Sequence, residues 1–121
     1  IHTPGHSLGS VCYLDKSGRI LFSGDTVNRG IITIDKPEGT EKDLANYRDS
    51  IEKIWARKDE FDHLAIGHDG GLIDKGIVKD YLDLANGILE GSIVGKYEEE
   101  GIRKGVVARL GAAELWYRCY A

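Results

Sequence analysis

The feature that most constrains the fold is a predicted β-hairpin that is followed by a long helix and a third strand. Residues 10–15 and 19–23 are apolar and β-prone, and the "DKSG" between them is a turn with glycine at its last position. Residues 41–58 carry apolar side chains at helical spacing, and "HLAIGH" at 63–68 contains a short apolar strand. Because a strand–helix–strand crossover joins parallel strands, the strands at 19–23 and 63–68 are predicted to run parallel in an α/β fold.

Two amphipathic helices are predicted to pack on the outer face of the sheet. The first, at 41–58, follows the capping-box pattern of Thr40 and Asp43, and the second, at about 75–90, has Asp74 as its candidate cap. The apolar stripes of these helices are Leu44, Tyr47, Ile51, Ile54 and Trp55 in the first and Ile77, Tyr81, Leu82, Ala85, Ile88 and Leu89 in the second.

The remaining segments have weaker patterns. Residues 31–39 contain a proline and a glycine and are interpreted as a loop or a short strand. Residues 91–104, with three glycines and "EEE", are predicted to be a polar connection, and residues 105–120 alternate around Gly111 as a closing hairpin does. At 121 residues without an internal repeat, the chain is predicted to be one domain.

Composition excludes several classes of protein. Apolar residues at 41% and charged residues at 30% fit a globular domain and exclude a disordered or collagen-like chain. A net charge of −4 supplies no basic field for nucleic acid or an anionic membrane. We find no bilayer-length apolar stretch and no signal-type segment, so we expect a cytoplasmic protein. Cys12 and Cys119 lie far apart in strand-like segments, where buried free thiols are expected.

Three polar side chains are predicted to meet at one edge of the sheet. In the hairpin, Asp25 lies across from about residue 8, which places His6 within roughly 7 Å at about 3.3 Å per strand residue. The crossover then brings His68 to the same edge as Asp25. Two imidazoles and a carboxylate form a ligand set for a borderline cation such as zinc. Gly5, Gly24 and Gly67 let the backbone turn sharply beside these ligands.

Each of these residues also has an ordinary structural interpretation. A histidine after a turn is commonly solvated, and the aspartate of a "GD" pair at a strand end commonly caps a turn. Taken singly, each residue is more often structural than functional. Their shared placement at one edge makes a metal site as good an interpretation as three unrelated structural roles.

Three segments resemble the third, fourth and fifth metal motifs of the metallo-β-lactamase superfamily in its glyoxalase II-like form. They are "HTPGHSLGS" at 2–10, "LFSGDT" at 21–26 and "AIGHDGG" at 65–71, and "GAAELWY" resembles the final strand of many members. The resemblance covers most of residues 1–90. It implies that residues 1–121 are a single partial domain, the C-terminal half of an αββα sandwich, with one mixed β-sheet and helices on its outer face.

The resemblance also implies roles for the ligands. His6 would bind the first metal, Asp25 would bridge both metals, and His68 would bind the second, and no catalytic residue beyond these ligands and no organic cofactor site is identified. In the complete site, two divalent metals, zinc first with iron or manganese as alternatives, activate a shared hydroxide. That hydroxide attacks an ester, thioester, lactone, lactam or phosphoester of a small-molecule substrate.

The other histidines are given no role in the metal site. His2 matches no ligand position and is interpreted as a loop residue, because Pro4 and Gly5 prevent it from pairing with His6 across a helical turn. His63 is interpreted as a solvated residue at the start of its strand. Asp69 follows a ligand directly and could orient it, although a turn cap is the simpler expectation.

The chain departs from the family at one important point. The H-x-H-x-D-H motif, which supplies the other ligands, is absent, and so is the N-terminal half of the sandwich. A structural zinc site uses four protein ligands and a catalytic one at least three, so we expect His6, Asp25 and His68 to hold one ion weakly and not to form the binuclear centre. We therefore expect little or no activity from the chain alone. The chain begins at Ile1, which fits a fragment of a longer hydrolase.

Two other functions stay open. In the first, the chain is a non-catalytic module whose exposed inner sheet face pairs with a second copy, as a dimer, or with a separate N-terminal half. In the second, it is a small binding protein with an acidic surface and no metal, an interpretation that depends on composition alone.

Overall fold

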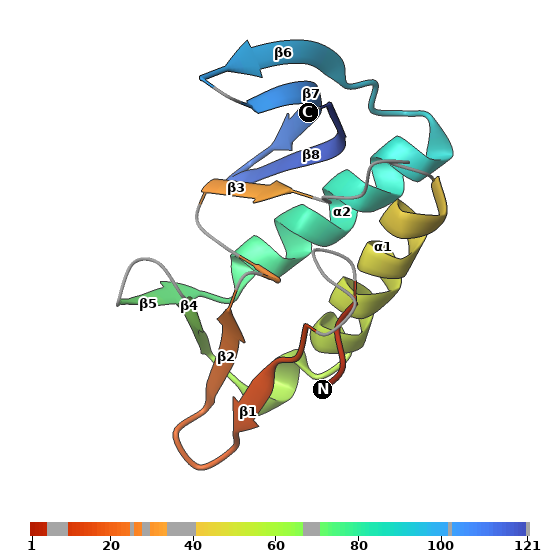
Figure 1. The fold of residues 1–121 in the computed structure, drawn as a ribbon. Coiled ribbons are helices and arrows are strands. Elements are labelled where there is room, and N and C mark those ends of the chain that lie inside the picture. The colour runs from red at the N-terminus through yellow and green to blue at the C-terminus, as the bar shows by residue number, and fades with distance from the viewer. Residues whose placement is uncertain are drawn as a thin grey trace.

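The computed structural model describes residues 1–4, 10–24, 26–27, 30–33, 41–66, 71–101 and 103–120. Within them the elements are, in chain order, β1 (Tyr13–Asp15), β2 (Ile20–Gly24), β3 (Gly30–Thr33), α1 (Glu41–Trp55), the short 3-10 helix η1 (Lys58–Glu60), β4 (His63–Ile66), β5 (Leu72–Asp74), α2 (Gly76–Glu90), β6 (Lys96–Glu100), β7 (Arg103–Leu110) and β8 (Ala113–Tyr120). Figure 1 shows both helices along one side of the strands. The α/β class is therefore confirmed.

The predicted hairpin and crossover are both confirmed. Strands β1 and β2 pair antiparallel, with Leu14 opposite Leu21. After α1 the chain returns to β2 as the parallel strand β4, with Leu21 opposite Leu64. The apolar segments, the turn and the long helix between them were sufficient to predict this part of the topology.

The strands form two sheets where the sequence predicted one. In the described residues, one four-stranded sheet has the order β1-β2-β4-β5 and the other has the order β3-β8-β7-β6. β3 is separated from β2 by only a few residues, yet it pairs in parallel with β8 at the other end of the chain. A pattern of apolar residues identifies a strand but does not identify its distant partner, which is why a single sheet was predicted.

Helix α1 ends three residues earlier than predicted. The Arg57 amide donates to the Ile54 carbonyl at 3.0 Å, so the last turn tightens and leads into η1. Leu44, Tyr47, Ile51 and Ile54 are buried as predicted. Trp55 packs against the core but is only partly buried, so its predicted full burial was wrong.

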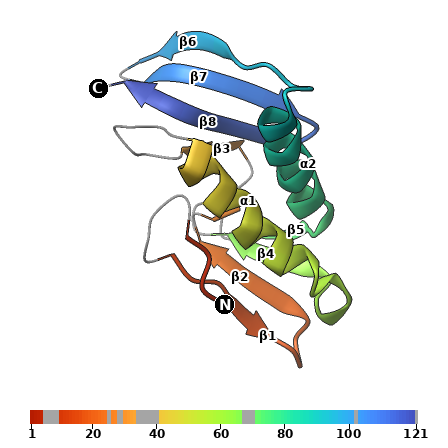
Figure 2. The ribbon, with the colours of Figure 1, turned by 90° about the vertical axis from the view of Figure 1, so that its right-hand side faces the viewer.

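Helix α2 packs between α1 and the second sheet. It contacts α1, β7 and β8, and Figure 2 shows the two helices side by side. The predicted cap Asp74 lies one residue before the N-cap position, which is Lys75 and makes no side-chain capping bond, so that prediction was wrong. The Asp74 carboxylate still accepts the Gly76 amide at 3.0 Å, because a short aspartate side chain reaches the main chain two residues on. Thr40, half of the other predicted cap, lies outside the described residues. One core, built from α1, α2 and both sheets, includes Ile51, Leu64 and Leu115.

Two strands were not predicted. β5 extends the first sheet antiparallel to β4, and β6 pairs antiparallel with β7, so the prediction of a polar connection over residues 91–104 was wrong at β6. β6 lies at the edge of its sheet, and its sequence "KYEEE" is exposed over most of its length. Charge on an edge strand prevents pairing with other chains, and it also hides the strand from sequence analysis. No described helix is long and apolar enough to cross a membrane.

Candidate metal centre

The carboxyl ends of two parallel strands form the frame of the candidate site. Gly24 at the end of β2 lies opposite Ile66 at the end of β4. In the sequence, Asp25 directly follows β2 and His68 comes two residues after β4. Side chains that follow adjacent parallel strands leave the sheet at the same edge, which was the basis of the sequence prediction.

The segment that contains His6 is closed at both ends by main-chain contacts. His2 and Val11 form an isolated antiparallel bridge, and the Thr3 amide donates to the Ser10 carbonyl at 2.8 Å. His6 lies between Thr3 and Ser10 in the sequence. The described residues before and after the His6 segment are therefore joined to each other near β1.

All three predicted ligands, His6, Asp25 and His68, lie outside the residues that the structure describes. Gly5, Gly67 and Asp69 do as well. Their convergence and their distances stay predictions, and the described strands and flanking residues supply the surroundings in which those predictions can be tested.

The end of β2 is irregular directly before Asp25. The register with β4 shifts between Phe22 and Gly24, and Gly24 has a φ of 52°. A bulge redirects the chain at a strand end, and a positive φ favours glycine because it has no Cβ. The predicted sharp turn at Gly24 is confirmed. The Ser23 hydroxyl donates to the Val27 carbonyl at 3.2 Å, which joins the described residues on either side of Asp25.

Two buried threonines connect the segments on either side of the candidate site. The hydroxyl oxygens of Thr3 and Thr26 lie 3.1 Å apart, and both residues are almost completely buried. Thr3 comes three residues before His6, and Thr26 comes directly after Asp25. The sequence analysis missed this pair. The sequence did offer one sign of it, because each threonine lies within a metal motif, Thr3 three residues before His6 and Thr26 directly after Asp25.

Cys12 lies beside these threonines. It is buried and free, as predicted, and its sulfur is 3.6 Å from the Thr3 hydroxyl. Burial raises the pKa of the thiol and so disfavours the thiolate, the form that acts as a nucleophile.

The other two histidines are among the described residues, with His63 in β4 and His2 in an isolated bridge with Val11. His63 is exposed at the amino end of β4, where it pairs with Ile20, so the whole strand separates it from Ile66. His2 contributes its main-chain carbonyl, which accepts a hydrogen bond from the Lys53 ammonium at 2.7 Å. No group of three or more histidine, cysteine, aspartate or glutamate side chains among the described residues could hold a metal ion. His6, Asp25 and His68 lie outside the described residues to which this statement applies. As a donor set, two imidazoles and a carboxylate fit zinc.

The face of the first sheet opposite the helices carries an exposed apolar row. Tyr13 lies opposite Phe22, Phe22 opposite Ala65, and Ala65 opposite Leu72, so one row crosses all four strands. Tyr13, Phe22 and Leu72 are 69%, 47% and 53% exposed. These four residues, which we call the apolar row, line a shallow groove of about 460 Å³ that also touches Gly24 and Ile66 at the candidate site.

Comparison with known proteins identifies the family. The model of the metallo-beta-lactamase superfamily matches residues 1–68, which is more than half of the chain. This chain belongs to the metallo-beta-lactamase superfamily. The two helices and two sheets are consistent with a partial fold of that superfamily, as the motifs predicted.

Curated relatives match over a short segment. The acyl-coenzyme A thioesterase MBLAC2 of Bos taurus and that of Homo sapiens are each 60% identical to this chain over 30 residues. The protein of the same name from Gallus gallus is 57% identical over 30 residues. The match covers 25% of this chain and 11% of each relative. The family and these relatives support a hydrolase-family function.

Proposed function

We propose that this chain supplies one side of the active site of a metal-dependent hydrolase that cleaves acyl thioesters. The match of the superfamily model to residues 1–68, which contain the first two motifs and the third as far as His68, carries the proposal. The parallel pairing of β2 and β4 supports it, because Asp25 and His68 follow the carboxyl ends of those strands. The thioester substrate class is taken from the relatives, which are named acyl-coenzyme A thioesterase MBLAC2.

His6, Asp25 and His68 are the proposed ligands of divalent metal, with zinc as the first expectation. His6 is assigned to one metal, His68 to the other, and Asp25 to both. When bound, divalent metal lowers the pKa of water and polarises the acyl bond that is to be broken. Imidazoles bind metal in their neutral form, so metal affinity should fall in acid.

Hydrolysis and metal content test this proposal together. The chain should be assayed alone and with a separately produced N-terminal half that contains H-x-H-x-D-H, on an acyl-coenzyme A, a lactone and a lactam. We expect the combined halves to cleave the thioester best and the chain alone to have little activity. Asp25→Asn should reduce both the metal content and the rate.

His63→Ala is the matched control, because His63 lies at the other end of β4 from the candidate site. It should leave both measurements unchanged. Equal metal content in the wild type, Asp25→Asn and His63→Ala would exclude the proposed ligand set. Cleavage of the lactam or the lactone in preference to the thioester would keep the metal site and exclude the substrate class.

The apolar row favours a second function, assembly through the open sheet face. We infer that this face is covered by the sheet of an N-terminal half in a longer protein, and by a second copy when the chain is alone. The row exposes roughly 300 to 400 Å² of apolar surface, a patch size that commonly marks an interaction surface. A closed two-fold pair is the simplest arrangement for identical chains. A cytoplasmic location stays a prediction.

Sedimentation over a range of concentrations tests the assembly. The wild-type chain should associate, and the double variant Phe22→Asp with Leu72→Asp should remain monomeric. Val94→Asp is the control, because Val94 is 81% exposed and is not part of the apolar row. It should associate as the wild type does. A wild-type chain that stays monomeric at every concentration would rule out self-association.

A further inference from the structure

Three side chains of α1 donate hydrogen bonds to the two segments that flank the candidate ligands. Tyr47, Ser50 and Lys53 are spaced three residues apart and therefore lie along one side of the helix. The Tyr47 hydroxyl donates to the Thr26 carbonyl at 2.8 Å. The Ser50 hydroxyl lies 2.6 Å from the Pro4 carbonyl, and the Lys53 ammonium lies 2.7 Å from the His2 carbonyl.

The acceptors of these hydrogen bonds are main-chain carbonyls close to the ligands in the sequence. Thr26 directly follows Asp25, and Pro4 comes two residues before His6. A hydrogen bond to the main chain fixes the path of the backbone, whichever side chain that residue carries. α1 therefore binds both the segment before His6 and the segment after Asp25.

The two hydroxyls lie in surroundings that make these bonds persistent. Tyr47 is fully buried and Ser50 is 1% exposed, and the bond from Tyr47 to Thr26 is itself buried, which strengthens it relative to a bond in water. Burial raises the pKa of Tyr47 well above its ordinary value, so the hydroxyl keeps its proton and remains a donor at neutral pH. Ser50 also lies 3.0 Å from the Asn46 carbonyl, the usual acceptor for a serine within a helix. The shorter distance to Pro4 favours the bond outside the helix.

We propose that Tyr47 and Ser50 are positioning residues for the metal ligands His6 and Asp25. The proposal rests on the proposed function, since it assumes that these two residues bind metal. Each hydroxyl holds a backbone segment within two residues of a ligand, and the contact between Thr3 and Thr26 joins the two segments to each other. Partners that orient ligands without touching the metal commonly change affinity by 10- to 100-fold.

Removal of a single hydroxyl is the sharpest test. Tyr47→Phe keeps the ring, and with it the edge-on contact to Tyr81 at 6.5 Å between ring centroids. Ser50→Ala is the equivalent change at the second position. Tyr81→Phe is the matched control, because it also removes a buried tyrosine hydroxyl, one that contacts the main chain of Glu114 at 3.4 Å in the second sheet.

Two measurements separate positioning from general stability. Cobalt(II) titration of the 121-residue chain, followed by its visible spectrum, reports affinity and coordination geometry. Amide hydrogen exchange at Thr3 and Thr26 reports how firmly the flanking segments are held, and it needs no metal. We expect Tyr47→Phe and Ser50→Ala to weaken cobalt binding about tenfold and to speed exchange at these amides. Tyr81→Phe should do neither.

The outcomes distinguish this proposal from the proposed function. If the wild type binds cobalt and Tyr47→Phe and Ser50→Ala bind it equally well with an unchanged spectrum, the positioning role is wrong and the metal site stands. If Tyr81→Phe weakens binding as much as Tyr47→Phe, the effect is one of general stability and the positioning role is again wrong. If the wild type binds no cobalt either alone or combined with the separately produced N-terminal half, or if His6→Ala binds it as well as the wild type does, the metal site itself fails.

Discussion

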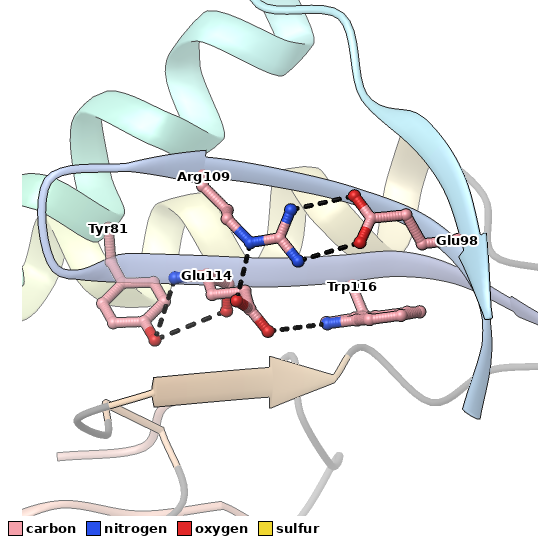
Figure 3. A network of polar contacts seen from close by, with 5 residues as sticks. All are labelled: Tyr81, Glu98, Arg109, Glu114 and Trp116. Carbon is pink, nitrogen blue, oxygen red and sulfur yellow. Dashed lines mark hydrogen bonds and ion pairs between the residues drawn. The ribbon is translucent and has the colours of Figure 1, made fainter. Parts of the chain in front are cut away.

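The two sheets differ in the face that each turns away from the helices. In the second sheet, Arg109 forms hydrogen bonds of 2.9 and 3.0 Å with Glu98 and of 2.7 Å with Glu114 (Figure 3). Glu114 also accepts the Trp116 indole N–H at 3.1 Å. In the first sheet, the corresponding face carries the apolar row.

This contrast separates a face whose charged groups are paired and on which Trp116 is fully buried from a face with an exposed apolar row. Arg109 and Glu98 connect β7 to β6, and Glu114 opposite Arg109 connects β7 to β8, so charged groups on this face have partners within the same sheet. The apolar row supplies no such partners. A sheet that is apolar on both faces is typical of one covered on both sides. The first sheet, which also leads to the candidate ligands, is therefore the part of the molecule suited to a partner.

The largest expected effect compares two neighbours in β2. Leu21 is fully buried among the helices, whereas Phe22 faces away and is 47% exposed. Leu21→Ala should destabilise the chain by about 3 kcal/mol, because it leaves a cavity in the core. Phe22→Ala should cost about 1 kcal/mol or less in the monomer. Urea unfolding at a concentration low enough to prevent association measures both.

Similar losses at the two positions would break the contrast between the faces. They would mean that the apolar row is already packed in the isolated chain. A large loss at Phe22 that grows with protein concentration would instead mean that a second copy covers the row, since dimer stability depends on concentration.

The sequence predicted elements with strong periodicity and missed those that depend on distant partners. Ile51 and Ile54 follow helical spacing, and their burial follows from that spacing alone. β3 could be identified only as a candidate strand, because its partner β8 lies at the other end of the chain. β6 is charged and exposed, so periodicity could not separate it from a loop.

The sequence supplies candidate ligands, which stay a prediction, but gives no sign of the contacts that surround them. His6, Asp25 and His68 belong to ordered motifs whose spacing is visible in the sequence. Tyr47 and Ser50 read as ordinary helix residues, and only the structure shows their contacts with Thr26 and Pro4. A main-chain acceptor leaves no mark in the sequence, because every residue carries a carbonyl.

A second prediction concerns Trp55, the last residue of α1. Trp55 is partly buried, and the Lys58 ammonium lies 5.6 Å from the centroid of its ring. Trp55→Ala should cost about 2 kcal/mol, less than the 3 to 5 kcal/mol of a fully buried tryptophan. Ile54→Ala, the fully buried neighbour, should cost at least as much in the same chemical unfolding experiment. A loss near zero at Trp55 would mean that this end of α1 contributes nothing to the core.

A third prediction tests the threonine pair beside the candidate site. Thr3→Val should cost about 1 kcal/mol, because it leaves the buried Thr26 hydroxyl without the partner that lies 3.1 Å away. Thr3→Val combined with Thr26→Val removes both hydroxyls and should cost less than the sum of the single changes. A double-mutant cycle from thermal or urea unfolding measures the coupling. Strict additivity would show that the two hydroxyls do not interact.

The smallest expected effect belongs to the polar face of the second sheet. The hydrogen bond from Arg109 lowers the pKa of Glu98 below its ordinary value of 4.5. A lowered pKa in the folded state stabilises the fold above the ordinary pKa, and this contribution is lost as pH falls through the folded value. Glu98→Gln should therefore reduce the urea midpoint slightly at pH 7, and the difference from wild type should shrink below pH 4.5 and disappear in stronger acid. Glu100→Gln, in the same strand, is the control.

Because Glu98 and Arg109 are both partly exposed, solvent screening keeps the effect small. A difference at pH 7 that persists unchanged at low pH would show that Glu98 acts through packing. In that case the polar face would be held together by the fit of its side chains and not by their charges.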